Sequence, residues 1–141
     1  MIMREAVTRA DLDACYKIRI KVFMDEQGVS EAEEFDGLDD GAIHLIGLDG
    51  ETPVAAARLR LLNHVGKIER VAVLAGHRGK GHARALMQDA LARLDALPQI
   101  TEAHLSAQTY VIPFYESLGF TPHGPEYPDA GIPHRDMSRP L

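Results

Sequence analysis

The chain is predicted to fold as an α+β domain, with a mixed, mostly antiparallel sheet flanked by about four helices. Three observations predict this class. Apolar segments of strand length alternate with amphipathic helical segments, the dipeptide Asp49-Gly50 has the character of a tight hairpin turn, and a turn containing Gly79 and Gly81 leads from a strand directly into a helix. The 141 residues, 45% hydrophobic, can bury one core, so residues 1–141 are expected to form a single domain.

The N-terminal half is predicted to contain four strands and one long helix. Residues 2–7 are a short strand. Thr8 and Asp11 have the spacing of a capping box, which predicts a helix from Thr8 to about residue 23. The acidic residues 25–41 are expected to form a loop with at most one short helix. Segments 42–48, 54–62 and 67–74 then form three consecutive antiparallel strands.

The C-terminal half is predicted to contain two helices and two or three strands. Apolar residues from Ala83 onward recur at helical spacing until Pro98 ends the helix. Residues 102–108 are a strand, followed by a helix that has Pro113 in its first turn and Gly119 after its last. Residues 120–137 are expected to form one or two edge strands around the loop 129–131.

Composition and charge exclude several classes of function. The net charge of -6 argues against nucleic-acid binding, because that affinity comes from Lys and Arg neutralising phosphates. No apolar segment is long enough to span a bilayer and no signal-peptide pattern is present. The single cysteine, Cys15, fits a reducing compartment, so we expect a cytoplasmic protein. No two histidines fall at ligand spacing on one element, so no metal site is expected.

The turn between the strand ending at Val73 and the following helix is predicted to bind an anion. Its basic residues are local in an otherwise acidic chain, and its glycines allow a ligand close to the backbone. Free N–H groups and the helix dipole favour negative charge at a helix N-terminus. A diphosphate group matches this chemistry, whereas a structural turn with solvated basic side chains is the alternative.

Two motifs resemble the GNAT superfamily of acetyl-CoA-dependent N-acetyltransferases. Segment 78–83, Arg-Gly-Lys-Gly-His-Ala, is similar to the Arg/Gln-x-x-Gly-x-Gly/Ala signature, and segment 114–120 is similar to the second signature of that superfamily. Segments 19–27, 34–39 and 131–134 further resemble the ElaA/YjcF-like subgroup, whose acceptors are poorly defined. The resemblance spans nearly the whole chain.

The resemblance implies a site for acetyl-CoA and a set of residues that form it. The backbone of Val71, Ala72 and Val73 would pair with the pantetheine arm. The pyrophosphate would bind the amides of Arg78, Gly79, Lys80, Gly81, His82 and Ala83. Gln108 stands where the family often has Asn and keeps an amide for the cofactor. Tyr115 matches the family tyrosine near the sulfur, where it would protonate the thiolate. Its alternative role is that of a core aromatic residue.

Acetyl transfer to an amine also needs a proton acceptor and a group that stabilises the oxyanion. Strand alternation places Glu69 on the face of Val71 and Val73, where it would take the amine proton through water, unless it is simply a strand carboxylate facing solvent. The N–H of Val73 or a neighbour is the expected oxyanion donor. His44 and His104 are candidates for the acceptor side. Cys15 lies on an apolar helix face, which argues against a covalent cysteine intermediate.

The acceptor is expected to be a small-molecule amine or a protein amine, and a second copy of the chain is a candidate partner. If the acidic run between Asp25 and Asp40 lines the mouth of the cleft, it would attract a basic amine; a solvated acidic face is the alternative. Two other functions stay open. One is an enzyme like the acyl-homoserine-lactone synthases, and the other is a non-catalytic CoA-binding module.

Overall fold

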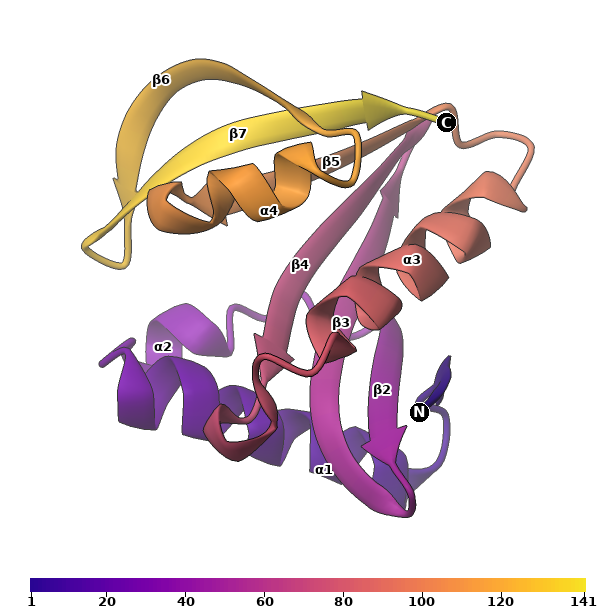
Figure 1. Ribbon diagram of the computed structural model, residues 1–141, viewed down its shortest axis with the longest axis vertical. Coiled ribbons are helices and arrows are strands. Elements are labelled where there is room, and N and C mark those ends of the chain that lie inside the picture. The colour runs from indigo at the N-terminus through magenta and orange to yellow at the C-terminus, as the bar shows by residue number, and fades with distance from the viewer.

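A seven-stranded sheet forms the centre of the computed structural model, which describes residues 1–141 (Figure 1). The strand order is β1-β2-β3-β4-β5-β7-β6, and every neighbouring pair is antiparallel except β4 and β5. The strands are β1 (Ile2–Glu5), β2 (Ile43–Asp49), β3 (Thr52–Leu62), β4 (Val65–Val73), β5 (Glu102–Gln108), β6 (Thr121–Asp129) and β7 (Ile132–Pro140). The predicted fold class is confirmed.

Helices cover both faces of the sheet. They are α1 (Arg9–Arg19), which continues as the π-helix η1 (Ile20–Glu26), α2 (Glu31–Glu34), α3 (His82–Asp95) and α4 (Ile112–Glu116), with short 3-10 turns η2 (Ala75–His77) and η3 (Thr109–Val111). The backbone N–H of Asp11 donates to the Thr8 hydroxyl at 3.1 Å, so Thr8 caps α1 as predicted. No helix has both the length and the apolarity needed to cross a bilayer.

Two separate apolar clusters attach the helices. On one face, Cys15, Ile18 and Val22 pack against β2, β3 and β4. On the other face, the larger cluster joins α3 and α4 to the sheet, and its centre lies where α3 crosses β4. Gly66 is required at this crossing, because a Cβ atom there would lie 2.5 Å from a methyl carbon of Leu94.

Two predictions about the elements need correction. β6 is an edge strand as predicted, but β7 is not, because it pairs with β5 on one side and with β6 on the other. The segment after Phe23 is also not loop from residue 25, since the first helix continues to Glu26 with wider π-type turns. Both differences concern long-range pairing or hydrogen-bond pattern, which the local sequence does not specify.

Candidate active site

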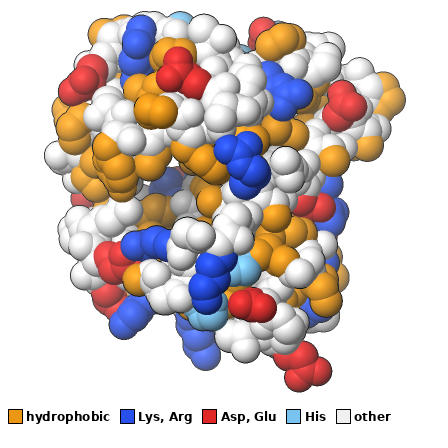
Figure 2. Space-filling model, in the orientation of Figure 1, with side chains coloured by type: hydrophobic (Ala, Val, Ile, Leu, Met, Phe, Trp, Pro, Cys, Tyr) orange, Lys and Arg blue, Asp and Glu red, His pale blue; other side chains and the backbone are white.

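A cleft opens where β4 and β5 diverge. The two strands pair only between Val65–Lys67 and Glu102–His104, and beyond that point they separate (Figure 1). The cleft has a volume of about 770 Å³. Figure 2 shows the hollow between the part of the molecule built by β5, β6, β7 and α4 and the part built by α1 and β2 to β4, with basic and histidine side chains gathered beside it. The predicted site residues that line it are Glu69, Val71, Ala72, Val73, Arg78, Gly79, Gly81, His82, Ala83, Gln108 and Tyr115, whereas Lys80 does not.

The glycine turn forms one end of this cleft with unused hydrogen-bond donors. The N–H groups of Gly79, Lys80 and Gly81 donate to no backbone acceptor, and the first turn of α3 adds further free N–H groups. Gly79 and Gly81 have φ of 76° and 83°, and a Cβ atom at either would meet nothing within 4 Å. The turn is therefore open to a ligand and has a left-handed backbone that glycine adopts without strain.

The C-terminal end of β4 presents backbone polar groups to the cleft. The N–H of Leu74 donates to the Val54 carbonyl at 2.9 Å, so the ladder alternation directs the N–H and C=O of Val73 away from β3. The Val73 carbonyl accepts a hydrogen bond from Nε of Arg78 at 2.9 Å. Arg78 also lies 2.9 Å from Glu26. The Val73 N–H thus stays available in the cleft, whereas its carbonyl already has a partner.

Glu69 does not share the face of Val71 and Val73, contrary to the prediction from alternation. Ala56 pairs with Ala72 and Arg58 with Glu69, so two residues of β4 lie opposite one residue of β3. This β-bulge places Arg70 at a φ of 55° and reverses the alternation beyond it. Glu69 consequently turns toward the α1 side at the edge of the cleft.

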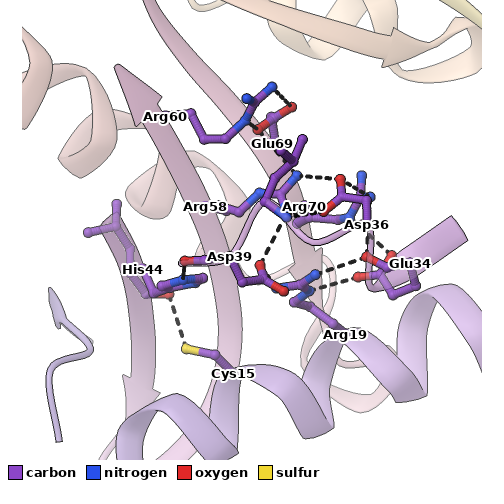
Figure 3. Close-up of polar contacts among 12 residues, drawn as sticks. Cys15, Arg19, Glu34, Asp36, Asp39, His44, Arg58, Arg60, Glu69 and Arg70 are labelled. Carbon is purple, nitrogen blue, oxygen red and sulfur yellow. Dashed lines mark hydrogen bonds and ion pairs between the residues drawn. The ribbon is translucent and has the colours of Figure 1, made fainter. Parts of the chain in front are cut away.

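There Glu69 belongs to a buried ion network (Figure 3). It contacts Nε of Arg60 at 2.6 Å and Nη2 of Arg58 at 3.3 Å. Burial raises the pKa of Glu69, but the hydrogen bond from Arg60 and the charges of Arg58 and Arg60 outweigh that effect, and the pKa is lowered overall. A carboxylate held in this way is a weak proton acceptor.

The same network contains the central carboxylates of the acidic run that was expected at the cleft mouth. Arg19, which is 1% exposed, contacts Glu34 at 2.7 Å and Asp39 at 2.6 Å, and Arg58, which is fully buried, contacts Asp36 at 2.9 Å (Figure 3). Of the predicted run, only Glu26 lines the cleft. The run is therefore neither a lining of the cleft nor merely a solvated face, because its central carboxylates are paired with arginines from α1, β3 and β4.

Tyr115 and Gln108 line the cleft on the α4 and β5 side. The Tyr115 hydroxyl makes no hydrogen bond to the protein, and burial raises the pKa of Tyr115 to about 12. The phenol therefore keeps its proton at neutral pH and is free to donate it into the cleft. Gln108 donates through Nε2 to the Gln27 side chain at 2.9 Å, which links the end of β5 to the end of η1 across the cleft.

His134 is a cleft residue that sequence reasoning did not propose for the site. Its Nδ1 lies 2.7 Å from the Ile132 carbonyl, and its ring stacks on Tyr127. Because a carbonyl only accepts, Nδ1 is the donor and Nε2 retains its lone pair. His44 and His104, the candidates from sequence, are outside the cleft. The segment 131–134 was noted only as a resemblance, and the pairing of β7 with β5 brings its histidine into the cleft.

Cys15 is not placed to act as a nucleophile. It is 1% exposed, its thiol donates to the Leu45 carbonyl at 3.5 Å, and burial raises its pKa to about 12. It does not line the cleft.

Comparison with known proteins identifies the class of protein. Residues 11–141 match the family model of the acetyltransferase (GNAT) domain. The chain is 40% identical over 128 residues to the uncharacterised N-acetyltransferase YjcF of Bacillus subtilis, covering 90% of each chain. The crystal structure of Escherichia coli ElaA superposes with a TM-score of 0.87 and 28% identity, covering 98% of each chain. The crystal structure of an acyl-CoA N-acyltransferase from Pseudomonas aeruginosa superposes with a TM-score of 0.84 and 29% identity, covering 98% of this chain and 97% of that one.

The chain therefore belongs to the GNAT acetyltransferase family, and it is an acyltransferase of the ElaA/YjcF-like type.

Proposed function

We propose that the protein transfers an acetyl group from acetyl-CoA to a primary amine by direct attack within a ternary complex. The observation that carries this proposal is the cleft itself. It has unused N–H donors of the glycine turn at one end and a half-buried phenol and an imidazole on its walls. Together these supply an anion-binding site, a proton donor and a proton acceptor along one opening between β4 and β5.

In this proposal the glycine turn binds the pyrophosphate of acetyl-CoA through the amides from Arg78 to Ala83. The polar backbone at the end of β4 pairs with the pantetheine arm, as another strand would. The N–H of Val73 stabilises the oxyanion that forms when the amine nitrogen attacks the thioester carbonyl. Gln108 uses one N–H for its hydrogen bond to Gln27, and its second N–H and its Oε1 remain for the arm.

Tyr115 acts on the leaving group. Because the pKa of its phenol is about 12, full transfer of its proton to a thiolate is uphill. The hydroxyl therefore stabilises the developing thiolate chiefly by donating a hydrogen bond, as the carbon–sulfur bond breaks. Its freedom from protein partners leaves it available for this role.

We assign the proton acceptor to His134 in preference to Glu69. The attacking amine must lose a proton, and a neutral imidazole with a free Nε2 is suited to take it near neutral pH. The lowered pKa of Glu69 makes that carboxylate a poorer base, and its two arginine partners favour the charged form. Glu69, at the edge of the cleft, orders a water between the amine and the imidazole in this proposal.

A direct assay tests the function. The protein is mixed with acetyl-CoA and a panel of small amines and lysine peptides, and release of free thiol is followed. We expect acceptor-dependent release with intersecting initial-rate patterns. Release with no acceptor dependence and no acetylated product would favour the non-catalytic CoA-binding module. A preference for long acyl-CoA donors would favour the homoserine-lactone-synthase-like alternative.

The base assignment has its own test. We expect His134→Gln to lower kcat by about 10²-fold or more and to remove the acidic limb of the kcat/KM profile, with acetyl-CoA affinity unchanged. The matched variant Glu69→Gln should keep that limb. Loss of the limb in Glu69→Gln and its retention in His134→Gln would transfer the role to Glu69.

A further inference from the structure

Three side chains from three elements converge at the outer end of the glycine turn. Asp49 ends β2, His77 ends η2 and His82 begins α3. Their ligand atoms, Asp49 Oδ2, His77 Nδ1 and His82 Nε2, all lie within 4.8 Å of one another. The two histidine nitrogens are 3.8 Å and 3.9 Å from the Asp49 oxygen. On the face shown in Figure 2, histidine side chains lie beside an acidic one.

These distances are too long for hydrogen bonds, and both nitrogens lack any other partner. His82 is 6% exposed, and its Nε2 and the Nδ1 of His77 are buried without a hydrogen bond. Other histidines differ, since the Nε2 of His44 and the Nδ1 of His134 each have a carbonyl partner. Buried polar atoms without a partner are costly, so their convergence on one carboxylate calls for an explanation.

The two ring nitrogens of His82 differ in their partners. Its Nδ1 lies 3.0 Å from the sulfur of Met1, and a thioether can only accept a hydrogen bond. The neutral imidazole that donates from Nδ1 to this sulfur has a lone pair on Nε2, the nitrogen 3.9 Å from the Asp49 carboxylate. That nitrogen and the Asp49 carboxylate face the same space from two sides, 3.9 Å apart. A cation between them would be bound by both.

We propose that Asp49, His77 and His82 form a binding site for a first-row divalent metal ion, with Zn²⁺ as the best fit. Two imidazoles and one carboxylate are a known three-ligand set for Zn²⁺, with bonds of about 2.0–2.2 Å and a fourth position left for water. Nitrogen ligands favour Zn²⁺ and its neighbours over Mg²⁺ and Ca²⁺. With such bonds, tetrahedral ligand atoms lie about 3.4 Å apart, so the Asp49 oxygen needs to approach each histidine nitrogen by about half an ångström, and its side chain, 53% exposed, has the freedom to do so. The two histidine nitrogens, within 4.8 Å of each other, need to close by up to about 1.4 Å through rotation of the His77 side chain, which is 30% exposed.

Ligand spacing along a single element does not reveal this site. His77 and His82 are separated by the glycine turn, and Asp49 comes from the distant β2–β3 hairpin, so no spacing pattern connects them. The ion would tie that hairpin to the turn that carries Gly79 and Gly81. A further consequence, which rests on the proposed function, is that bound metal should tighten CoA binding by ordering this turn.

Metal titration of the tag-free protein tests the site without reference to catalysis. After treatment with a chelator, the protein is titrated with Co²⁺ and with Zn²⁺ alone. We expect one equivalent of Co²⁺ to bind with the visible absorption of tetrahedral coordination, Zn²⁺ to displace it, and Zn²⁺ to raise the melting temperature. Asp49→Asn and His77→Ala should each weaken Zn²⁺ binding by about 10- to 100-fold or more.

His104→Ala is the matched control, because His104 also lies beside a carboxylate, 3.2 Å from Glu102, but outside the cluster. It should leave Zn²⁺ binding unchanged. Asp49 and His77 are at the surface rim, so their variants are expected to fold, and circular dichroism verifies this. Absence of stoichiometric binding, or equal affinity in the Asp49→Asn, His77→Ala and His104→Ala variants, would overturn the proposal. Unchanged CoA affinity on adding Zn²⁺ would reject only the coupling to the cofactor turn.

Discussion

The glycine turn after β4 and the ion network beside the bulge of β4 are both rich in charge, but they differ in their hydrogen-bond partners. The carboxylates of the network have arginine partners, whereas several N–H groups of the turn have none. In the network, four arginines meet four carboxylates, and each carboxylate lies within 3.3 Å of an arginine nitrogen. In the turn, several N–H groups have no protein partner. Removing one partner of a buried pair costs stability because it leaves the other charge without compensation, whereas open groups without partners are available to a ligand. The comparison predicts that substitutions in the network affect stability and substitutions in the turn affect cofactor binding.

The largest expected effect is on stability, from Arg58→Met in the network. Arg58 is fully buried and contacts Asp36, Asp39 and Glu69, so its removal takes one of two arginine partners from each and leaves four carboxylates against three arginines. We expect the free energy of unfolding to fall by about 3–5 kcal/mol, measured by urea denaturation. Arg78→Met, which removes a pair with Glu26 at the cleft rim, should cost less than about 1 kcal/mol and weaken CoA binding instead. Equal stability losses in the two variants would remove the distinction.

Gly81→Val should abolish measurable CoA binding, with an affinity loss of about 100-fold or more and the fold retained. A β-branched side chain resists the φ of 83° and fills the space before α3. Calorimetry on the folded variant measures the effect. Gly124→Val is the matched control, because Gly124 has a φ of 74° with no neighbour near its Cβ position and lies outside the cleft. Comparable loss of CoA affinity in both variants would mean that strain, and not the ligand site, is responsible.

Tyr115→Phe should reduce kcat by about 10²-fold and leave acetyl-CoA affinity nearly unchanged. The hydroxyl makes no bond to the protein, so the ring and its contacts with Phe114 and Phe120 are preserved. A hydrogen bond to the leaving thiolate forms only as the bond breaks, so its loss appears in turnover. Turnover equal to that of the unmodified protein would assign stabilisation of the leaving thiolate to water instead of Tyr115.

Acid should destabilise the protein through the network. The pKa of Asp36 is lowered, mainly by its hydrogen bond from Arg58, and the pKa values of Asp39 and Glu69 are lowered because their arginine partners outweigh the effect of burial. Such groups stabilise the fold above their unfolded pKa values of about 4, and this contribution is lost as pH falls through the lower folded values. Urea midpoints should therefore fall below about pH 4, and Arg58→Met should show a weaker dependence. An identical pH profile in that variant would contradict the assignment.

The smallest effect is expected from the exposed part of the acidic run. Glu31→Gln with Asp40→Asn removes two charges that have no ion-pair partner and do not line the cleft. The kcat/KM for an acceptor amine should change less than about twofold, because charges outside the cleft are screened over about 8–10 Å, and its salt dependence should match that of the unmodified protein. A clear flattening of the salt dependence would restore the acidic run as a steering surface.

The local sequence alone determined most of the elements. Thr8 capping α1, the Asp49-Gly50 hairpin, the strand 102–108 and the glycine turn into α3 all depend on neighbours within a few residues, so their patterns predict them correctly. The family resemblance, and not the local pattern, predicted that the turn residues, Tyr115 and Gln108 share one site. All of them except Lys80 line the cleft, and their roles in binding and catalysis stay predictions.

Only the tertiary structure decided which side chains face one another. One extra residue in β4 turned Glu69 away from Val71 and Val73, and pairing of β7 with β5 brought His134 into the cleft. Folding also joined the acidic run to arginines of α1, β3 and β4, and placed Asp49 beside His77 and His82. A bulge reverses side-chain direction without leaving a clear mark in composition. Long-range pairing depends on packing and charge compensation between segments that are distant in the chain, so local periodicity cannot specify it.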